Sequence, residues 1–146
     1  MKKAFLFLAL CLLGAGRAAA AEPVDSVRNV IYMIGDGMGL AHVSMLAVEG
    51  GYAPTAFDRA QGIALISTYS ANNRVTDSAA AGTALACGSK TNNGTLGLDP
   101  RGGRLQSVIE WAVAEGMPAG IAVKCHLQHA TPAAFYAHVP DRGDEK

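Results

Sequence analysis

The chain has 146 residues with 12 basic and 12 acidic side chains, so its formal net charge is zero, and charged residues make up 16% of it. This balance shows no excess of basic residues of the kind with which proteins bind nucleic acids or acidic membranes, so neither partner is implied. The 17 glycines and the low charge favour a buried α/β domain with tight loops over a disordered chain.

The first 21 residues are typical of a cleavable export signal. A basic start (MKK) precedes an apolar run, and small residues then offer a cleavage site after Ala21. The run is too short to span a bilayer comfortably, so no membrane span is expected after cleavage. Cys11 lies inside this run without a small residue before it, which argues against a lipoprotein. We therefore predict an exported protein, periplasmic or secreted, whose mature domain covers residues 22–146.

The first half of the mature chain alternates strand, helix and strand. Residues 28–35 form a short β-rich apolar run ending in glycine, which predicts a buried strand. Residues 40–51 favour a helix that ends at its glycine pair. Residues 62–70 predict a second strand.

The second half continues this alternation. Residues 77–88 are nearly all small and predict a helix, and residues 90–103 are typical of a loop because they contain Asn-Gly, Asp-Pro and Gly-Gly. Residues 104–116 place apolar side chains three and four apart, which predicts an amphipathic helix facing a core. Residues 119–125 predict a third strand, and the last segment begins as a loop that turns helical after Pro132.

Strands that alternate with helices predict an α/β fold with a mostly parallel sheet covered by helices on both faces. In such sheets, ligands bind beyond the carboxyl ends of the strands. Asp36 and residues 126–131 directly follow predicted strands, and the Asp77–Ser78 pair follows another after a short loop. Three polar clusters are therefore expected on one edge of the sheet.

Ser78, near the start of the predicted helix 77–88, has two interpretations. It is either a helix N-cap or a nucleophile whose phosphate sits at the helix N-terminus. A helix N-terminus supplies at most about 2 kcal/mol, equivalent to roughly 1.5 pKa units. Zinc moves the pKa of bound water from about 15.7 to about 7, a far larger effect. A nucleophilic Ser78 therefore needs a base or a metal, and Asp36 fits the metal route better than a triad.

The other polar residues also have two interpretations each. Asp36 is either a metal ligand or part of an ordinary Asp-Gly turn. His126, His129 and His138 are either metal ligands or hydrogen-bonded residues of a polar loop, and the second interpretation suits His126 and His138 better. Arg142 either holds a phosphate through two hydrogen bonds or is simply solvated in a charged tail.

Taken together, three stretches resemble the alkaline phosphatase family. They are "NVIYMIGDGMG", "VTDSAAAGTALACGSKTNNGTLG" and "HLQHATPAAFYAHVPDR", which follow one another in the family's order and cover nearly all of the mature segment. The resemblance implies a three-layer alkaline phosphatase-like fold, incomplete in this chain, and a phosphate monoester hydrolase. It also implies that the full-length protein forms a homodimer.

The resemblance implies a catalytic role for three residues. Ser78 is expected to be the nucleophile that forms a phosphoserine intermediate. Asp77 is expected to lie beside it and to orient Arg142, and Arg142 is expected to hold two phosphate oxygens.

The resemblance also implies two zinc ions and one magnesium ion. Asp36 is expected to bridge one zinc and the magnesium, and Thr131 is expected to bind magnesium. His129 stands where the enterobacterial form has Asp and the animal form has His, and it is expected near the magnesium. Most zinc ligands are expected downstream of Lys146.

Four histidines in the mature segment are too few for two zinc sites and a magnesium site. We therefore expect these 146 residues to be the N-terminal part of a phosphatase precursor, without appreciable activity alone. The alternatives are a non-enzymatic exported fragment and a related phosphodiesterase or sulfatase, although "VTDSAAAGTA" argues against the latter two enzymes. Whether Cys87 and Cys125 form a disulfide is left open.

Overall fold

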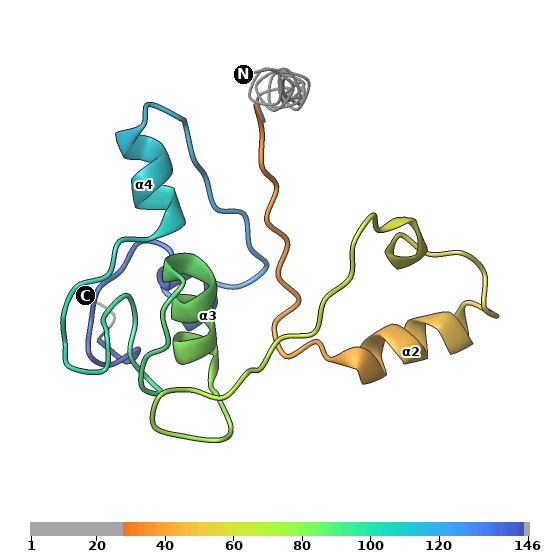
Figure 1. Cartoon of the computed structure of the whole chain (residues 1–146), viewed down its shortest axis with the longest axis horizontal. Helices are drawn as coiled ribbons and strands as arrows, with labels where there is room; N and C mark the ends of the chain where they lie inside the picture. The colour runs from red at the N-terminus through yellow and green to blue at the C-terminus, as the bar shows by residue number, and fades with distance from the viewer. Residues whose placement is uncertain (1–27, 145–146) are drawn as a thin grey trace, which may run out of the picture. The chain divides into compact units, whose positions relative to one another are not determined.

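The structure is a computed structural model that describes residues 28–144 (Figure 1). The predicted export signal, residues 1–21, lies outside the described residues. The chain divides into two units, residues 1–33 and 34–146, and all helices described below belong to the second unit. In the described part of the chain, no helix has the length and apolar character needed to cross a membrane.

Helix α3 (Ser78–Cys87) is the central element of the packed part of the chain. Its sequence, SAAAGTALAC, is rich in alanine, the residue with the highest helix propensity. Asp77 is the N-cap and accepts a hydrogen bond from the Ala80 amide at 2.9 Å. Gly88 ends the helix in the left-handed conformation, with φ of 68°. The predicted helix 77–88 is therefore confirmed, with Asp77 rather than Ser78 as its cap.

Helix α5 (Ala130–Ala133) packs against α3 through small side chains. Five buried residues form the core here: Ala79, Leu96, Ala130, Ala133 and Ala134. A Cβ at Gly82 would lie only 2.9 Å from the Ala134 Cβ, so the missing side chain allows the two segments to approach closely. The helix begins before Pro132, not after it, because proline is tolerated in the first turn of a helix.

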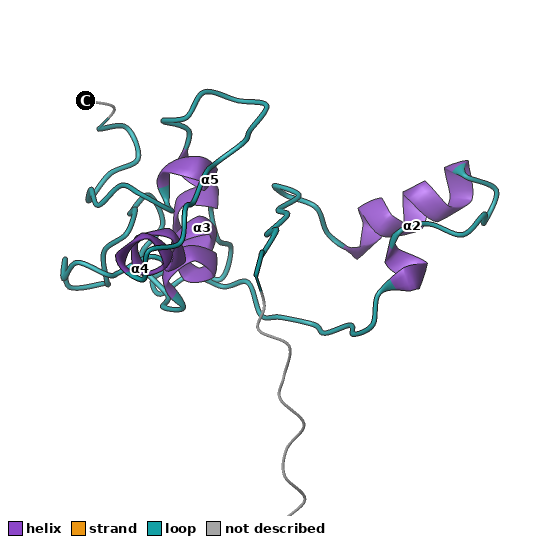
Figure 2. Ribbon diagram, turned by 90° about the horizontal axis from the view of Figure 1, so that it is seen from above, coloured by secondary structure: helices purple, strands orange, loops and turns teal. Residues whose placement is uncertain are grey.

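Helix α4 (Val108–Ala114) also contacts α3 and is shorter than the predicted helix 104–116. Ser107 and Glu110 form a capping box, in which the Glu110 carboxylate accepts from the Ser107 amide at 2.9 Å. The cap starts the helix at residue 108, and Arg104 instead forms an antiparallel bridge with Leu98. Figure 2 shows α3, α4 and α5 close together.

Helix α2 (Leu40–Glu49) and the 3₁₀ helix η1 (Phe57–Arg59) contain no buried residue. The α2 helix ends at Gly50, as the predicted helix 40–51 required. Its large apolar residues are mostly exposed, including Met45 at 62% and Val48 at 56%. The local sequence is therefore sufficient to form α2, whereas nothing in the described residues buries its apolar side chains.

The three predicted strands, residues 28–35, 62–70 and 119–125, are not strands in the structure. Within residues 28–144 the β-bridges are isolated and antiparallel, joining Leu96 to Val139 and Leu98 to Arg104. Figure 2 accordingly draws the described chain as helices and loops. A strand is defined by its partner, and Ile63 (87% exposed) and Leu65 (81%) lie open to solvent. The parallel sheet therefore stays a prediction.

Candidate active site

The head of α3 joins Asp77 and Ser78 to a loop that follows the helix. One oxygen of Asp77 caps α3, and its other oxygen, Oδ2, accepts a hydrogen bond from the Gly94 amide at 3.0 Å. Ser78 occupies the first position of the helix, so its hydroxyl takes no part in capping. The N-cap interpretation of Ser78 is therefore wrong, and its side chain is free to interact elsewhere.

Arg142 reaches Asp77 although the two lie 65 residues apart. An antiparallel bridge between Leu96 and Val139, with hydrogen bonds of 2.9 and 3.0 Å, aligns the two segments. The Arg142 amide donates to the Gly94 carbonyl at 2.7 Å, and its guanidinium lies 3.5 Å from Asp77 Oδ2. The Arg142 side chain is 33% exposed, so it can also contact a ligand in solvent. The structure thus brings Arg142 beside Asp77, and the catalytic roles of the two residues stay predictions.

Asp36 faces Ser78 from a glycine-flanked turn. The turn is closed by a hydrogen bond of 3.0 Å from the Met38 amide to the Gly35 carbonyl, and Gly37 adopts φ of 69°. Ser78 Oγ lies 3.2 Å from Asp36 Oδ1 and 3.4 Å from Oδ2, which are long hydrogen-bond distances. The Asp36 carboxylate can therefore accept a hydrogen bond from the Ser78 hydroxyl.

Thr131 of α5 completes this cluster. Its hydroxyl donates to Asp36 Oδ2 at 2.8 Å, across 95 residues of sequence. Asp36 thus contacts both Ser78 and Thr131. A carboxylate beside a hydroxyl presents oxygen atoms, which are the ligands that Mg²⁺ prefers. The pair therefore fits part of a magnesium site.

His129 is the N-cap residue of α5, two positions before Thr131. Its Nδ1 is buried and has no hydrogen-bond partner among residues 28–144, and its ring packs edge-on against His126 at 5.6 Å between centroids. A buried nitrogen without a partner carries a desolvation cost that a ligand would remove. The structure shows no hydrogen bond between His129 and Asp36, so its predicted place near a magnesium ion stays a prediction.

The two other histidines of interest have structural partners. His138 Nε2 lies 2.8 Å from the Leu105 carbonyl and 3.4 Å from Glu110. His42 Nδ1 accepts from the Gly39 amide at 3.2 Å at the start of α2. Among residues 28–144, no group of three or more His, Cys, Asp or Glu side chains is placed to hold a metal ion. The described residues therefore do not form a zinc site with three such ligands.

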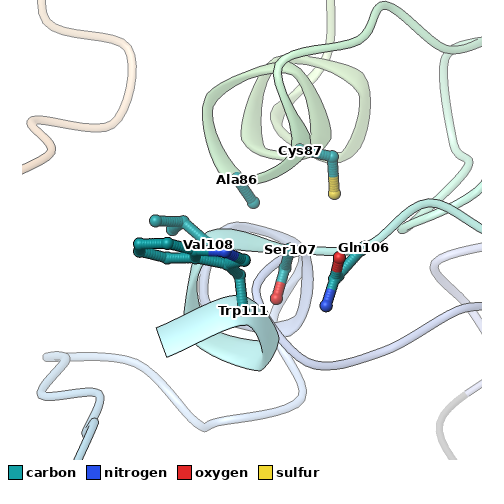
Figure 3. Close-up of a pocket in the computed structure, with 6 residues that line it drawn as sticks. All are labelled: Ala86, Cys87, Gln106, Ser107, Val108 and Trp111. Atoms are coloured by element: carbon teal, nitrogen blue, oxygen red, sulfur yellow. The ribbon is translucent and has the colours of Figure 1, made fainter. Parts of the chain in front are cut away.

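Neither cysteine is part of the cluster of candidate active-site residues. Cys87 and Cys125 are both free thiols in the structure, and burial, together with the charge of Glu110, raises the pKa of Cys87. Cys87 lines an open hollow of about 280 Å³ at the far end of α3, shown in Figure 3 with Trp111 and Ser107. Because Ser78 begins the helix and Cys87 ends it, this hollow is separate from the candidate active site.

Asn93 and Gly94 contribute to the site, and sequence reasoning missed both. The Gly94 amide and carbonyl bind Asp77 and Arg142, and the Asn93 side chain binds the backbone of residues 75–77. The "TNNG" segment was recognisable only as a turn, because Asn-Gly is common wherever a chain reverses.

Comparison with known proteins defines the class of the chain. A protein-family model described as alkaline phosphatase matches residues 27–146. The chain therefore belongs to the alkaline phosphatase family, as the resemblance predicted.

Curated relatives carry the same name. The chain is 41% identical over 134 residues to alkaline phosphatase 4 of Bacillus subtilis, covering 85% of this chain and 29% of that protein. It is 39% identical over 131 residues to alkaline phosphatase 4 of Drosophila melanogaster, covering 79% and 22% respectively. The chain thus spans less than a third of the length of these relatives.

Solved structures show the fold. An alkaline phosphatase from Shewanella sp. aligns with a TM-score of 0.72 at 40% identity, over 77% of this chain and 30% of that one. The enzyme from the Antarctic bacterium TAB5 aligns with a TM-score of 0.69 at 35% identity, over 74% and 32%. The aligned part of the chain has the alkaline phosphatase fold.

Proposed function

We propose that this chain contributes the nucleophile and phosphate-binding arginine of a metal-dependent phosphate monoester hydrolase that acts through a phosphoserine intermediate. The observation that carries the proposal is the position of Ser78. Because Asp77 caps α3, the Ser78 hydroxyl takes no part in capping, and it lies 3.2 Å from the Asp36 carboxylate. The relatives' shared name, alkaline phosphatase, supports the reaction class.

Ser78 Oγ gives its proton to water and attacks the phosphorus atom, the bond from phosphorus to the alcohol oxygen breaks, and the departing alcohol takes up a proton from water. Asp36 accepts the hydrogen bond of the serine hydroxyl and so holds its oxygen toward the substrate. Arg142, held by Asp77, binds two phosphoryl oxygens, and the positive end of the α3 dipole favours the remaining negative charge. Water then cleaves the phosphoserine and releases inorganic phosphate.

The proposed cofactors are two zinc ions and one magnesium ion. Asp36 and Thr131 would hold magnesium, and His129, whose Nδ1 makes no hydrogen bond among the described residues, would lie close to that ion. A variant of the TAB5 enzyme has been solved with magnesium bound in its M3 site, which supports a magnesium site in this family. When bound, the metals lower the pKa of the attacking oxygen and neutralise negative charge at the leaving oxygen.

Zinc requires more ligands than the described residues bring together. We assign most zinc ligands to residues beyond Lys146, in the part of the relatives that this chain does not match. The predicted strands 28–35, 62–70 and 119–125 pair into the mostly parallel sheet in that same context, with helices on both faces. Their exposed apolar side chains, such as Ile63 and Leu65, support this assignment.

A chimeric enzyme tests the proposal. Residues 27–146 replace the matching segment of the Bacillus subtilis relative, and hydrolysis of p-nitrophenyl phosphate is measured with zinc and magnesium present. We expect activity that Ser78→Ala abolishes and that Ser44→Ala leaves intact, since Ser44 only bonds within α2 at the Leu40 carbonyl. Mass spectrometry of enzyme quenched at low pH should find phosphate on Ser78. An active chimera that survives Ser78→Ala would rule out the proposed nucleophile.

The same assay on the 146-residue chain alone tests the assignment of the zinc ligands. We expect no appreciable turnover with both metals added, because the described residues lack the required ligand groups. Turnover comparable to that of a full-length relative would overturn this assignment and leave Ser78 as the proposed nucleophile.

Export is also proposed, to the periplasm or the medium. If the first 21 residues are a signal, the secreted protein should begin at Glu22. Determination of the N-terminal sequence of protein recovered from outside the cytoplasm tests this, and an uncleaved N-terminus on exported protein would contradict it.

A further inference from the structure

Asn93, in the loop after α3, bonds through its side chain to the segment that precedes Ser78. Its Oδ1 accepts a hydrogen bond from the Asp77 amide at 3.2 Å, and its Nδ2 donates to the Val75 carbonyl at 2.9 Å. One half-buried carboxamide therefore clamps the segment that leads into Ser78. A carboxamide satisfies both groups, because one partner needs an acceptor and the other needs a donor, whereas an ionised carboxylate offers acceptors alone.

The loop that carries Asn93 is itself fixed. The Asn93 amide donates to Asn72 Oδ1 at 2.9 Å, and a hydrogen bond of 3.1 Å from the Thr95 amide to the Asn92 carbonyl closes a turn. Gly94 lies inside this turn with φ of 85°, a conformation that favours glycine. The turn thus presents Gly94 in one orientation.

Gly94 transmits that orientation to two residues of the site, through the Asp77 side chain and the Arg142 backbone. Its amide donates to Asp77 Oδ2 at 3.0 Å, and its carbonyl accepts from the Arg142 amide at 2.7 Å. The position of the turn therefore sets the position of Arg142 relative to Asp77, and Asn93 sets the position of the turn relative to residues 75–77. A shift of the turn would separate the arginine from the nucleophile.

We propose that Asn93 is a positioning residue, which holds the Gly94 turn against residues 75–77 so that Arg142 and Ser78 face the same phosphoryl group. The inference rests on the proposed function, in which Arg142 binds phosphate. Asn93 touches neither substrate nor metal in this proposal, and it acts through Gly94 and Asp77.

The clamp itself can be tested in the full 146-residue chain by NMR measurement of amide hydrogen exchange. Asn93→Ala removes both hydrogen bonds, and Asn93→Asp keeps the shape but places an acceptor against the Val75 carbonyl. We expect the exchange of the Gly94 amide to accelerate ~10-fold in both variants, which corresponds to about 1.4 kcal/mol. Asn92→Ala is the matched control, because Asn92 Nδ2 bonds only to the Pro100 carbonyl, at 3.4 Å. Exchange that is unchanged in both Asn93 variants would overturn the clamp.

Kinetics of the chimera separate positioning from a merely structural role. If Arg142 is displaced, KM for p-nitrophenyl phosphate and the inhibition constant of inorganic phosphate should both rise ~10-fold in Asn93→Ala and Asn93→Asp. A residue that only stabilises the fold would lower the fraction of active enzyme and hence the apparent kcat, with both constants unchanged. That second pattern would overturn the proposal.

The two arms also distinguish this proposal from the proposed function. An active chimera that depends on Ser78 but has an unchanged phosphate inhibition constant in both Asn93 variants removes Asn93 as a positioning residue and keeps the nucleophile. An inactive chimera removes support from the proposed function, and the exchange measurement then still decides whether Asn93 holds the Gly94 turn.

Discussion

Two regions of the second unit differ in how their residues are held. In the packed region, residues 70–114 and 130–142, side chains bond to backbone groups far away in sequence. Ser107 Oγ donates to the Phe135 carbonyl at 2.6 Å across 28 residues, and Thr95 Oγ1 donates to the Pro140 carbonyl across 45. In the open region, residues 39–69, the side-chain bonds of residues 39–59 span four residues or fewer.

The difference shows that helix formation and burial have separate causes. The α2 helix forms from its own pattern and its terminal glycines, yet contributes no buried residue. The α3 helix has a similar length, but Ala79, Ala80 and Thr83 are buried because α4, α5 and the loop at Leu96 cover it. Apolar sequence therefore creates the potential for a core, and only a partner segment realises it.

The largest effect on the packed region is expected at Gly97. Its φ is 60°, and a Cβ there would collide with the Ala137 carbonyl oxygen and the ring of His138. Gly97→Ala should therefore lower the free energy of unfolding by about 3 kcal/mol, through both strain and overpacking. Urea denaturation followed by the fluorescence of Trp111, the single tryptophan, measures this.

The control for Gly97 is Gly102→Ala. Gly102 also has positive φ, 87°, but a Cβ there meets no atom within 4 Å. Gly102→Ala should therefore lower the free energy of unfolding by about 1–2 kcal/mol, which is the cost of the left-handed backbone conformation alone. Equal destabilisation by the two substitutions would show that the 94–98 loop is not packed against residues 137–139.

A smaller decrease in the free energy of unfolding is expected from substitution of Thr83, whose side chain is fully buried. Its hydroxyl accepts from the Gly97 amide at 3.0 Å and donates to the Thr95 carbonyl at 3.3 Å. Thr83→Val keeps the shape but leaves both groups without partners, which should cost about 2 kcal/mol. Thr83→Ser, which keeps the hydroxyl, should retain more stability than Thr83→Val under the same denaturation. The reverse order would mean that packing of the methyl group dominates.

Local signals predicted the helices of both regions because caps are encoded within a few residues. Gly88 and Gly50 marked the C-terminal ends of α3 and α2 before any partner was known, and the Asp77–Ser78 pair marked the start of α3. The start of α4 was predicted too early, although the Ser-x-x-Glu pattern at residues 107–110 carried the correct signal. Local signals do not establish the strands in this way, because residues 62–70 need hydrogen-bond partners from another segment, and no local pattern specifies those partners.

The site was predictable in its members but not in its contacts. Family-like motifs named Ser78, Asp77 and Arg142, and the structure places them together. Asn93 was not predictable, because its role depends on a backbone amide 16 residues earlier in the chain. The sequence could not show which of Asp77 and Ser78 caps α3, since Asp and Ser cap helices about equally well, and the structure identifies Asp77 as the cap.

A pH-dependent contribution is expected from Glu110, at the edge of the packed region. Burial opposes its ionisation, but the Ser107 amide, His138 and Arg104 outweigh this and hold the pKa of Glu110 below its ordinary value of 4.5. A lowered pKa stabilises the fold above pH 4.5, and the contribution is lost as the pH falls through the lower folded value. Because the side chain is 24% exposed, the effect should be about 0.5 kcal/mol.

The measurement compares unfolding free energies of the unaltered chain and Glu110→Gln from pH 7 down to pH 3. The difference between them should shrink below pH 4.5 as the native carboxylate is protonated. Glu115→Gln is the control, since Glu115 lies at the C-terminal cap of α4 and outside the capping box. If the difference in unfolding free energy between the two proteins stays constant from pH 7 to pH 3, the charge of the Glu110 carboxylate does not stabilise the fold.

The smallest effect in the isolated chain is expected at Ile66, in the open region. Its side chain is 72% exposed, so Ile66→Thr should change the free energy of unfolding by less than about 0.5 kcal/mol. Leu96→Ala, in the core, should cost about 3 kcal/mol in the same assay. In the chimera, where we propose that residues 62–70 join a parallel sheet, Ile66→Thr should instead cost about 1–2 kcal/mol, because the side chain is then buried. Threonine keeps the β-branched shape, so the change in cost between the two settings measures burial rather than strand propensity. A substitution that is silent in both settings would show that this segment remains open even in the complete fold.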